Sequence, residues 1–177
     1  MNDPRLILNA IAIRRVLTRI GHEIAERNEA SSEVALVGIQ RGGIHLATRI
    51  GKTLEGIWGH PVPVGTVDVS MHRDDLDRQP APEVHPTEIP FDLNGKTVVL
   101  VDDVLFSGRT TRAALDSLND FGRPKCVQLA VLIDRGHREF PIKPDFVGKN
   151  IPTSKSEKIN VCLEETTGND AVFLELI

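Results

Sequence analysis

Apolar residues near the start of the chain recur at helical spacing and then give way to a continuous apolar run. The residues spaced three or four positions apart are Ile13, Val16, Leu17, Ile20 and Ile24. This spacing predicts an amphipathic helix over about Leu8 to Arg27. The run Val34–Ile39 is typical of a short strand covered on both faces of a sheet. A second helix is predicted over about Ile44 to Leu54, after a pair of glycines.

The rest of the chain continues to alternate strands with helices. A further helix is predicted over Arg109 to Phe121. Strands are predicted at Val62–Val69, Thr97–Val101 and Cys126–Ile133, with short ones near Asp145–Val147, Ile159–Leu163 and Ala171–Leu176. Alternation of this kind predicts an α/β fold, with a central, mostly parallel, twisted sheet flanked by helices. The strand-rich ends predict a small antiparallel addition, and 177 residues suit a single domain.

The stretch from Ser70 to Ile89 breaks this pattern. It contains three prolines and many charged residues, and its apolar residues follow no period. A surface loop this long within a compact domain is usually a functional lid or a disordered segment. We therefore expect a lid loop over about residues 70–89.

Composition and charge narrow the class of protein. Hydrophobic residues make up 40% of the chain and charged residues 26%, as in ordinary globular proteins. The net charge of -4 argues against a protein that coats nucleic acid, although a local basic patch is still compatible with RNA binding. No apolar run is long enough to cross a bilayer, and no signal-peptide pattern is present, so we expect a cytoplasmic protein. Cys126 and Cys162 follow no metal or disulfide pattern and are expected to be small buried residues.

The segment Val98–Thr110 carries the clearest chemistry. Asp102 and Asp103 end a predicted parallel strand, where open sheets bind ligands, and burial of two unpaired carboxylates in the core is not expected. The following Ser107 and Gly108 open a helix, whose free N–H groups favour an anion. The pattern is neither a Walker loop nor a dinucleotide fingerprint. It suits a sugar phosphate better than an ordinary strand-turn-helix with surface acids.

This segment resembles the phosphoribosyl-pyrophosphate (PRPP) signature of type I phosphoribosyltransferases. The resemblance implies a type I phosphoribosyltransferase fold with a hood and a flexible lid, and transfer of ribose phosphate to a nucleobase with release of pyrophosphate. It implies Mg²⁺ held mainly by PRPP, with no direct protein ligand but with Asp102 and Asp103 nearby. The implied catalytic residues are Asp102, Asp103 and Arg41. The implied phosphate-binding residues are Val104, Leu105, Phe106, Ser107, Gly108, Arg109 and Thr110.

A second loop is similar to the pyrophosphate loop of that superfamily. It follows the first buried strand and consists of Ile39, Gln40, Arg41, Gly42 and Gly43. Two glycines allow backbone amides to approach the leaving group, and Arg41 can offset its charge. Arg-Gly-Gly after a strand is a weak signal alone, because it also suits a plain helix start. The resemblance implies a cis peptide bond at Gln40–Arg41.

Four further segments are similar to the PyrR family of pyrimidine operon regulators with uracil phosphoribosyltransferase activity. They are Ile13–Ile20, Arg73–Leu76, Asp134–Glu139 and Val147–Ser154. The resemblance implies a hood over the base, formed by about residues 134–154 with the terminal segments. The implied hood residues are Asp134, Arg135, His137, Arg138, Lys149 and Asn150, where a solvated charged turn is the alternative. The implied lid residues are Arg73, Asp74 and Asp75.

Two positions depart from that family. Enzymes acting on 6-oxopurines typically have an aspartate at the position of Phe106, which disfavours hypoxanthine or guanine as substrate. The PyrR family usually has tyrosine there and also at the position of His72. The loss of the hydroxyl at position 72 affects the expected lid contact and not the fold.

The first predicted helix has a basic face opposite its apolar stripe. Residues 11–27 hold four arginines and two glutamates, a net charge of +2. By this helix alone, a solvated polar face is the simpler interpretation. The resemblance to PyrR favours an RNA-binding face formed by Arg15, Thr18, Arg19, His22 and Arg27.

Two functions from different classes therefore remain open at this point. One is an RNA-binding regulator that responds to UMP, binds the leader of a pyrimidine operon messenger RNA, forms a homodimer or larger homo-oligomer, and also makes UMP from PRPP and uracil. The other is an enzyme alone, acting on uracil without an RNA target or on another base. We expect no membrane partner for either.

Overall fold

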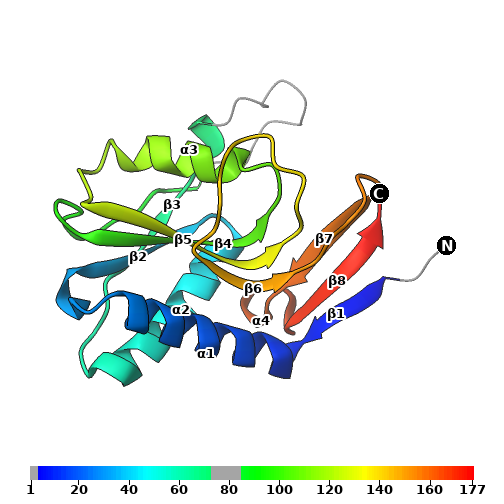
Figure 1. Ribbon diagram of the computed structural model, residues 1–177, viewed down its shortest axis with the longest axis horizontal. Helices are drawn as coiled ribbons and strands as arrows, with labels where there is room; N and C mark the ends of the chain where they lie inside the picture. Colours follow the sequence, from blue (N-terminus) through cyan, green and yellow to red (C-terminus); the bar gives the residue numbers. More distant parts are fainter. Residues whose placement is uncertain (1–3, 73–84) are drawn as a thin grey trace.

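A parallel sheet in the order β3-β2-β4-β5-β6 forms the centre of the protein (Figure 1). The computed structural model describes residues 4–72 and 85–177. The five strands are β2 (Val34–Ile39), β3 (Val64–Val67), β4 (Thr97–Leu105), β5 (Cys126–Asp134) and β6 (Phe146–Asn150). All four strand pairs of this sheet are parallel. The predicted α/β class is confirmed.

Helices cover both faces of this sheet. In Figure 1, α1 (Ala10–Arg27) and α2 (Gly42–Trp58) lie on one side and α3 (Arg109–Leu118) lies on the other. The cause is the alternation of side chains along buried strands. Val99 and Val101 of β4 belong to the apolar cluster beneath α1 and α2, whereas Val98 and Leu100 belong to the cluster beneath α3.

The two ends of the chain meet in a separate antiparallel sheet. It consists of β1 (Arg5–Asn9), β8 (Ala171–Leu176) and β7 (Glu157–Cys162), in that order, and α4 (Glu164–Thr167) connects β7 to β8. An antiparallel addition was expected, but β1 was not. The first helix begins at Ala10 instead of Leu8, because residues 5–9 pair with β8 and the Asn9 side chain caps the N–H of Ala12.

Three other expectations change in detail. The second helix runs from Gly42 to Trp58 and is longer at both ends than predicted. Cys126 is exposed and Cys162 is partly exposed, so the expectation that both are buried was wrong. The described part of the predicted lid contains a short 3₁₀ turn, η2 (Ser70–His72), and Glu88, which forms an isolated bridge with Thr66. Another 3₁₀ turn, η1 (Ser31–Glu33), precedes β2. Arg73, Asp74 and Asp75 lie outside the described residues.

None of the helices in the described ranges is long and apolar enough to span a lipid bilayer.

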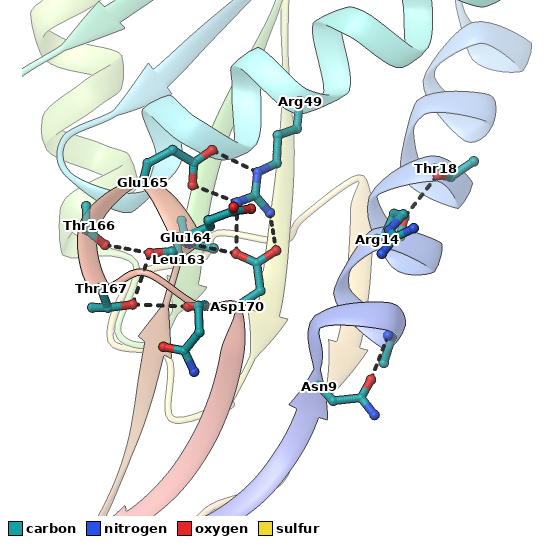
Figure 2. A network of polar contacts seen from close by, with 12 residues as sticks. Asn9, Arg14, Thr18, Arg49, Leu163, Glu164, Glu165, Thr166, Thr167 and Asp170 are labelled. Atoms are coloured by element: carbon teal, nitrogen blue, oxygen red, sulfur yellow. Dashed lines mark hydrogen bonds and ion pairs between the residues drawn. The ribbon is translucent and has the colours of Figure 1, made fainter.

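Arg49 of α2 joins this helix to the segment between β7 and β8 of the antiparallel sheet (Figure 2). Its guanidinium donates to both carboxylate oxygens of Asp170, at 2.7 and 2.8 Å, and to both of Glu165, at 2.9 and 2.6 Å. Asp170 also accepts the N–H of Glu164 at 2.8 Å. These hydrogen bonds lower the pKa of Asp170 and Glu165 and raise the pKa of Arg49. The α4 turn is thereby fixed against α2.

Replacing Arg49 with Met should lower the free energy of unfolding by about 2 kcal/mol at pH 7, because two partly buried carboxylates lose their donors. The partly exposed Glu165 contributes the smaller share. The lowered carboxyl pKa values make this contribution present above about pH 4 and lost as the pH falls through the folded-state values. Urea unfolding of both proteins at pH 7 and pH 3 measures the difference.

Lys125→Ala is the control for this measurement. Lys125 forms one ion pair with Glu33, and both side chains are about half exposed. We expect little change in stability at either pH, because screened surface pairs contribute little. An equal loss in the two variants would contradict a special role for Arg49.

Candidate functional site

A cavity of about 280 Å³ opens where the carboxyl ends of β2, β3 and β4 meet. Segments far apart in the sequence converge there, because neighbouring parallel strands end at the same edge of a sheet. Its lining residues are Gln40, Arg41, Asp68, Val69, Ser70, His85, Asp102, Asp103, Val104 and Thr110. The lining is largely polar and contains three carboxylates, Asp68, Asp102 and Asp103.

Asp102 and Asp103 follow the part of β4 that pairs with β2, which ends at Val101, and both line this cavity. Asp102 is 6% exposed, which is more buried than the sequence argument allowed. Its carboxylate accepts the N–H of Asp103 at 2.9 Å, and the Asp103 carboxylate accepts that of Val104 at 2.7 Å. Burial raises the pKa of Asp103, against the lowering effect of the Val104 N–H. Internal amides thus offset part of the desolvation cost of the carboxylates.

The loop after β2 lies directly against these acids. The Gln40–Arg41 peptide bond is cis, as the resemblance implied. A Cβ on Gly42 would overlap the Asp103 carboxylate, and one on Gly43 would overlap the carbonyl oxygen of Val101. The two glycines are therefore needed for α2 to begin beside β4. The first residues of α2 consequently lie against Asp103 and the main chain of Val101 and Asp102.

The turn between β4 and α3 has the geometry of an anion-binding helix start. Gly108 precedes α3 with a φ of 89°, in the left-handed region that favours glycine. Val104 and Thr110 line the cavity, whereas the Leu105 side chain is buried in the core under α3. Arg109 instead pairs with Glu139 at 2.7 Å. Neither Leu105 nor Arg109 is among the residues that line the cavity.

The expected hood residues surround a second cavity, of about 470 Å³. Its lining residues are Asp134, Arg135, Gly136, His137, Arg138, Asn150, Ile151, Pro152 and Thr153. Lys149 is exposed and is not among them. Arg138 donates to the carbonyl oxygen of Phe106 at 2.9 Å and to the Asp134 carboxylate at 2.6 Å. This arginine links the expected hood residues to the turn between β4 and α3.

Phe106 and Arg135 form the side of the hood nearest that turn. The Arg135 guanidinium lies 4.1 Å from the centroid of the Phe106 ring, and the His137 ring meets the same phenyl ring edge-on at 6.0 Å. Arg135 is 7% exposed and donates to Thr153 Oγ1 and to the carbonyl oxygens of Ser154 and Glu157. Burial lowers the pKa of Arg135. Arg135 therefore supports the hood from within.

The first cavity, at the carboxyl ends of β2, β3 and β4, is also lined by residues that the sequence did not single out. Asp68, Ser70 and His85 lie on the β3 side of the cavity, at the two ends of the predicted lid. The signal available was Asp68 itself, an acid at the end of a strand beside β2. Its partner His85 could not be found, because nothing in the sequence shows where the chain returns.

The basic face of α1 is exposed, and two of its arginines contact β6. Arg19 donates to the carbonyl oxygens of Val147 at 3.2 Å and Gly148 at 2.6 Å, and pairs with Glu23. Arg27 pairs with Asp145 at 2.7 Å. The side chains of Arg15, Thr18 and His22 are exposed on the same helix.

No cluster of three or more potential metal ligands of the His, Cys, Asp or Glu type occurs within residues 4–72 and 85–177. Asp102 and Asp103 nevertheless offer carboxylate oxygens, the ligand type that Mg²⁺ prefers. Their pairing suits a hydrated ion carried by a phosphate ligand better than a dedicated protein cage.

Comparisons with known proteins agree with this geometry. Residues 9–166 match the model of the phosphoribosyl transferase domain. Among solved structures, a hypoxanthine-guanine phosphoribosyltransferase from Bacillus anthracis has a TM-score of 0.75 at 15% identity and covers 100% of both chains. A hypoxanthine phosphoribosyl transferase from Trypanosoma cruzi has a TM-score of 0.73 at 18% identity, covering 97% of this chain and 91% of the other. These likenesses show the fold, that of the phosphoribosyltransferases.

Curated relatives are much more similar in sequence. The bifunctional protein PyrR of Roseiflexus sp. (strain RS-1) is 62% identical over 170 residues, 95% of this chain and 93% of the relative. The bifunctional protein PyrR of Bacillus subtilis (strain 168) is 53% identical over 177 residues, 98% of each. The chain belongs to the PyrR family of phosphoribosyltransferases.

Gly42→Ala should displace the Asp103 carboxylate and lower phosphoribosyl transfer by roughly 100-fold, the scale for misplacing one catalytic group. The matched control is Gly56→Ala in the same helix, where a methyl group meets nothing within 4 Å. This control should keep full activity and gain about 0.5–1 kcal/mol of stability. A steady-state transfer assay and urea unfolding measure both effects. Equal activity of the two variants would contradict the contact.

Proposed function

We propose that this protein transfers phosphoribosyl from PRPP to uracil, giving UMP and pyrophosphate, and that it also binds RNA in response to UMP. The observation that carries the enzymatic part is the meeting of Asp102 and Asp103 with the Gln40–Gly43 loop at one polar cavity. The cavity beneath the hood residues supplies a place for a base. PyrR relatives described as bifunctional support the combination of two functions.

The reaction replaces the bond from the ribose carbon to pyrophosphate with a bond from that carbon to a ring nitrogen of uracil. The nitrogen loses its proton to solvent water, and pyrophosphate leaves with the bonding electrons. Asp102 and Asp103 lie where they can accept hydrogen bonds from ribose hydroxyls and offset the cationic character of the ribose carbon. Arg41 and the first amides of α2 stabilise the departing negative charge.

Mg²⁺ held mainly by PRPP would neutralise phosphate charge, and Asp102 and Asp103 are the nearby residues that would accept hydrogen bonds from its hydration water. The phosphate of PRPP or UMP is assigned to the turn Val104–Thr110. Within it, Ser107, Gly108 and Thr110 offer main-chain amides and hydroxyls at the start of α3. The chain's contribution to rate is therefore alignment and fixed charge, without a general base among these residues.

The choice of uracil over a purine is supported by Phe106. Its ring packs against Arg135 and has no proton to exchange with a purine ring nitrogen. Asn150 and Ile151 line the cavity beneath the hood residues, where the Asn150 side chain and the main chain offer hydrogen-bonding groups to a small base.

The RNA-binding part rests on α1. Arg15, Thr18, Arg19 and His22 form an exposed basic face, and Arg27 lies one turn beyond. Arg19 holds the carbonyl oxygens of Val147 and Gly148, immediately before Lys149 and Asn150 in β6. Because Asn150 lines the base cavity, one strand joins the UMP site to the RNA face. A homodimer would place two such faces on one RNA.

Asp103→Asn should lower the turnover of uracil transfer by roughly 100-fold and leave the thermal midpoint unchanged, because a fixed charge beside the ribose is lost. Asp116→Asn, which changes an exposed carboxylate on α3, should keep full turnover. A radiolabelled uracil assay checks both. Near-normal turnover in Asp103→Asn, or faster transfer to hypoxanthine or guanine than to uracil, would contradict the proposal.

Arg19→Ala should weaken binding to the pyrimidine operon leader of the source organism by at least about tenfold in the presence of UMP. It should also reduce the dependence of affinity on salt, since phosphate contacts release counterions. Arg112→Ala, on the opposite side of the sheet, is the control and should bind normally. Gel shifts with and without UMP measure these affinities. Binding that ignores both UMP and Arg19 would leave uracil transfer alone as the function.

A further inference from the structure

Asp68 is an acid in the cavity that the proposed chemistry does not use. It follows the last residue of β3 and is 9% exposed. It lines the same cavity as Asp102 and Asp103, two strands away in the sheet order β3-β2-β4. A third negative charge beside a cavity for pyrophosphate works against ligand binding by repulsion. Its presence there calls for a compensating role.

The contacts of Asp68 point to that role. One carboxylate oxygen accepts the main-chain N–H of Ser70 at 2.7 Å, and the other accepts the main-chain N–H of His85. The main-chain N–H of Asp68 itself donates to Thr87 Oγ1 at 3.0 Å. One residue therefore joins the segment that leaves β3 to the segment that returns to it.

Neighbouring main-chain contacts continue this junction. Thr66 and Glu88 exchange two hydrogen bonds, of 2.8 and 3.0 Å, one step further from the cavity. These bonds hold the base of the junction but do not reach its end at the cavity. There, the Asp68 carboxylate accepts the main-chain N–H groups of both Ser70 and His85 and so joins the two segments. Both of those residues line the cavity.

The charge state of Asp68 agrees with these contacts. Burial acts to raise the pKa of Asp68, but hydrogen bonds from Ser70 and from the N–H of His85 outweigh it and leave the pKa below its usual value. The group is therefore ionised at neutral pH. An ionised carboxylate accepts two amide hydrogen bonds more strongly than a neutral acceptor would.

We propose that Asp68 is a positioning residue for the PRPP cavity, whose carboxylate fixes the main chain of Ser70 and His85 as the β3 side of the pyrophosphate site. The inference rests on the proposed use of this cavity for PRPP. Asp68 acts through those two residues and does not touch the reacting atoms. The two amide partners of Asp68 offset its negative charge. The β3 side of the cavity is therefore ordered with little added repulsion of pyrophosphate.

The test is Asp68→Asn, which keeps one acceptor but places an NH₂ group against one of the two amides. We expect the Michaelis constant for PRPP to rise about tenfold, since one charge-assisted hydrogen bond is lost. The constant for uracil should stay within about twofold and turnover within about threefold, because the base cavity and Asp102–Asp103 are untouched. This split between the substrates distinguishes positioning from a general loss of structure.

Asp92→Asn is the matched control. Asp92 accepts the N–H of Asn94 at 2.9 Å, the same two-residue spacing as Asp68 and Ser70, in an exposed turn that does not line the cavity. It should leave both Michaelis constants unchanged. If Asp68→Asn does not fold, Thr87→Val removes the acceptor for the Asp68 N–H and should raise the PRPP constant in the same direction by a smaller factor.

An unchanged PRPP constant in folded Asp68→Asn, or in Thr87→Val if that variant alone folds, would overturn the proposal. A proportional loss for PRPP and uracil, together with a lower thermal midpoint, would also overturn it and indicate a purely structural acid. Calorimetric titration of PRPP into each protein separates failure of the Asp68 proposal from failure of the proposed function. A wild type that binds PRPP but does not transfer it to uracil would refute the uracil assignment and leave the Asp68 comparison intact.

Discussion

The close approach of α2 to β4 is the constraint on which the rest of the site depends. Gly43 lies against the carbonyl oxygen of Val101, and Gly42 lies against the carboxylate of Asp103, with no room for a side chain in either place. This contact brings the start of a helix, which favours anions, beside two carboxylates, which repel them. A ligand that satisfies both must present hydroxyl groups or a cation to the acids and phosphate to the amides. A sugar pyrophosphate has this combination, and the geometry thus selects a ligand class before any base is considered.

The expected hood residues are held in place by hydrogen bonds from two arginines to other groups of the protein. Arg135 and Arg138 are cationic and were expected at the edge of the active site, yet their guanidinium groups donate mainly to carbonyl oxygens, to Thr153 and to Asp134. They hold the turn before α3, the loop of residues 150–154 and β7 in one arrangement. On the proposed use of this cavity, the contacts left for a base come from smaller groups, such as Asn150 and the main chain. Recognition of a small planar ligand in this way requires a rigid frame, which the arginines provide.

Much of this could be predicted from the sequence, for reasons that differ between elements. The run Val34–Ile39 is buried on both faces, so its composition alone indicated a central strand. Asp102 to Thr110 are consecutive, and their shared site needed no knowledge of the tertiary fold. By contrast, β1 has only five residues and exists through pairing with β8, which no local pattern reveals. The junction of Asp68 with His85 and the bonds from Arg135 to Ser154 and Glu157 likewise depend on where distant segments return.

The pairing of β1 with β8 also has a consequence for how the chain is made. Of the described elements, β1 is synthesised first and β8 last. During translation, β1 and the start of α1 lack their partner until every strand of the central sheet has been completed. Pairing of β1 with β8 is therefore a late event, after synthesis of the central sheet. The central sheet and the cavity at its carboxyl edge can form first, and the antiparallel sheet is completed only when β1 meets β8.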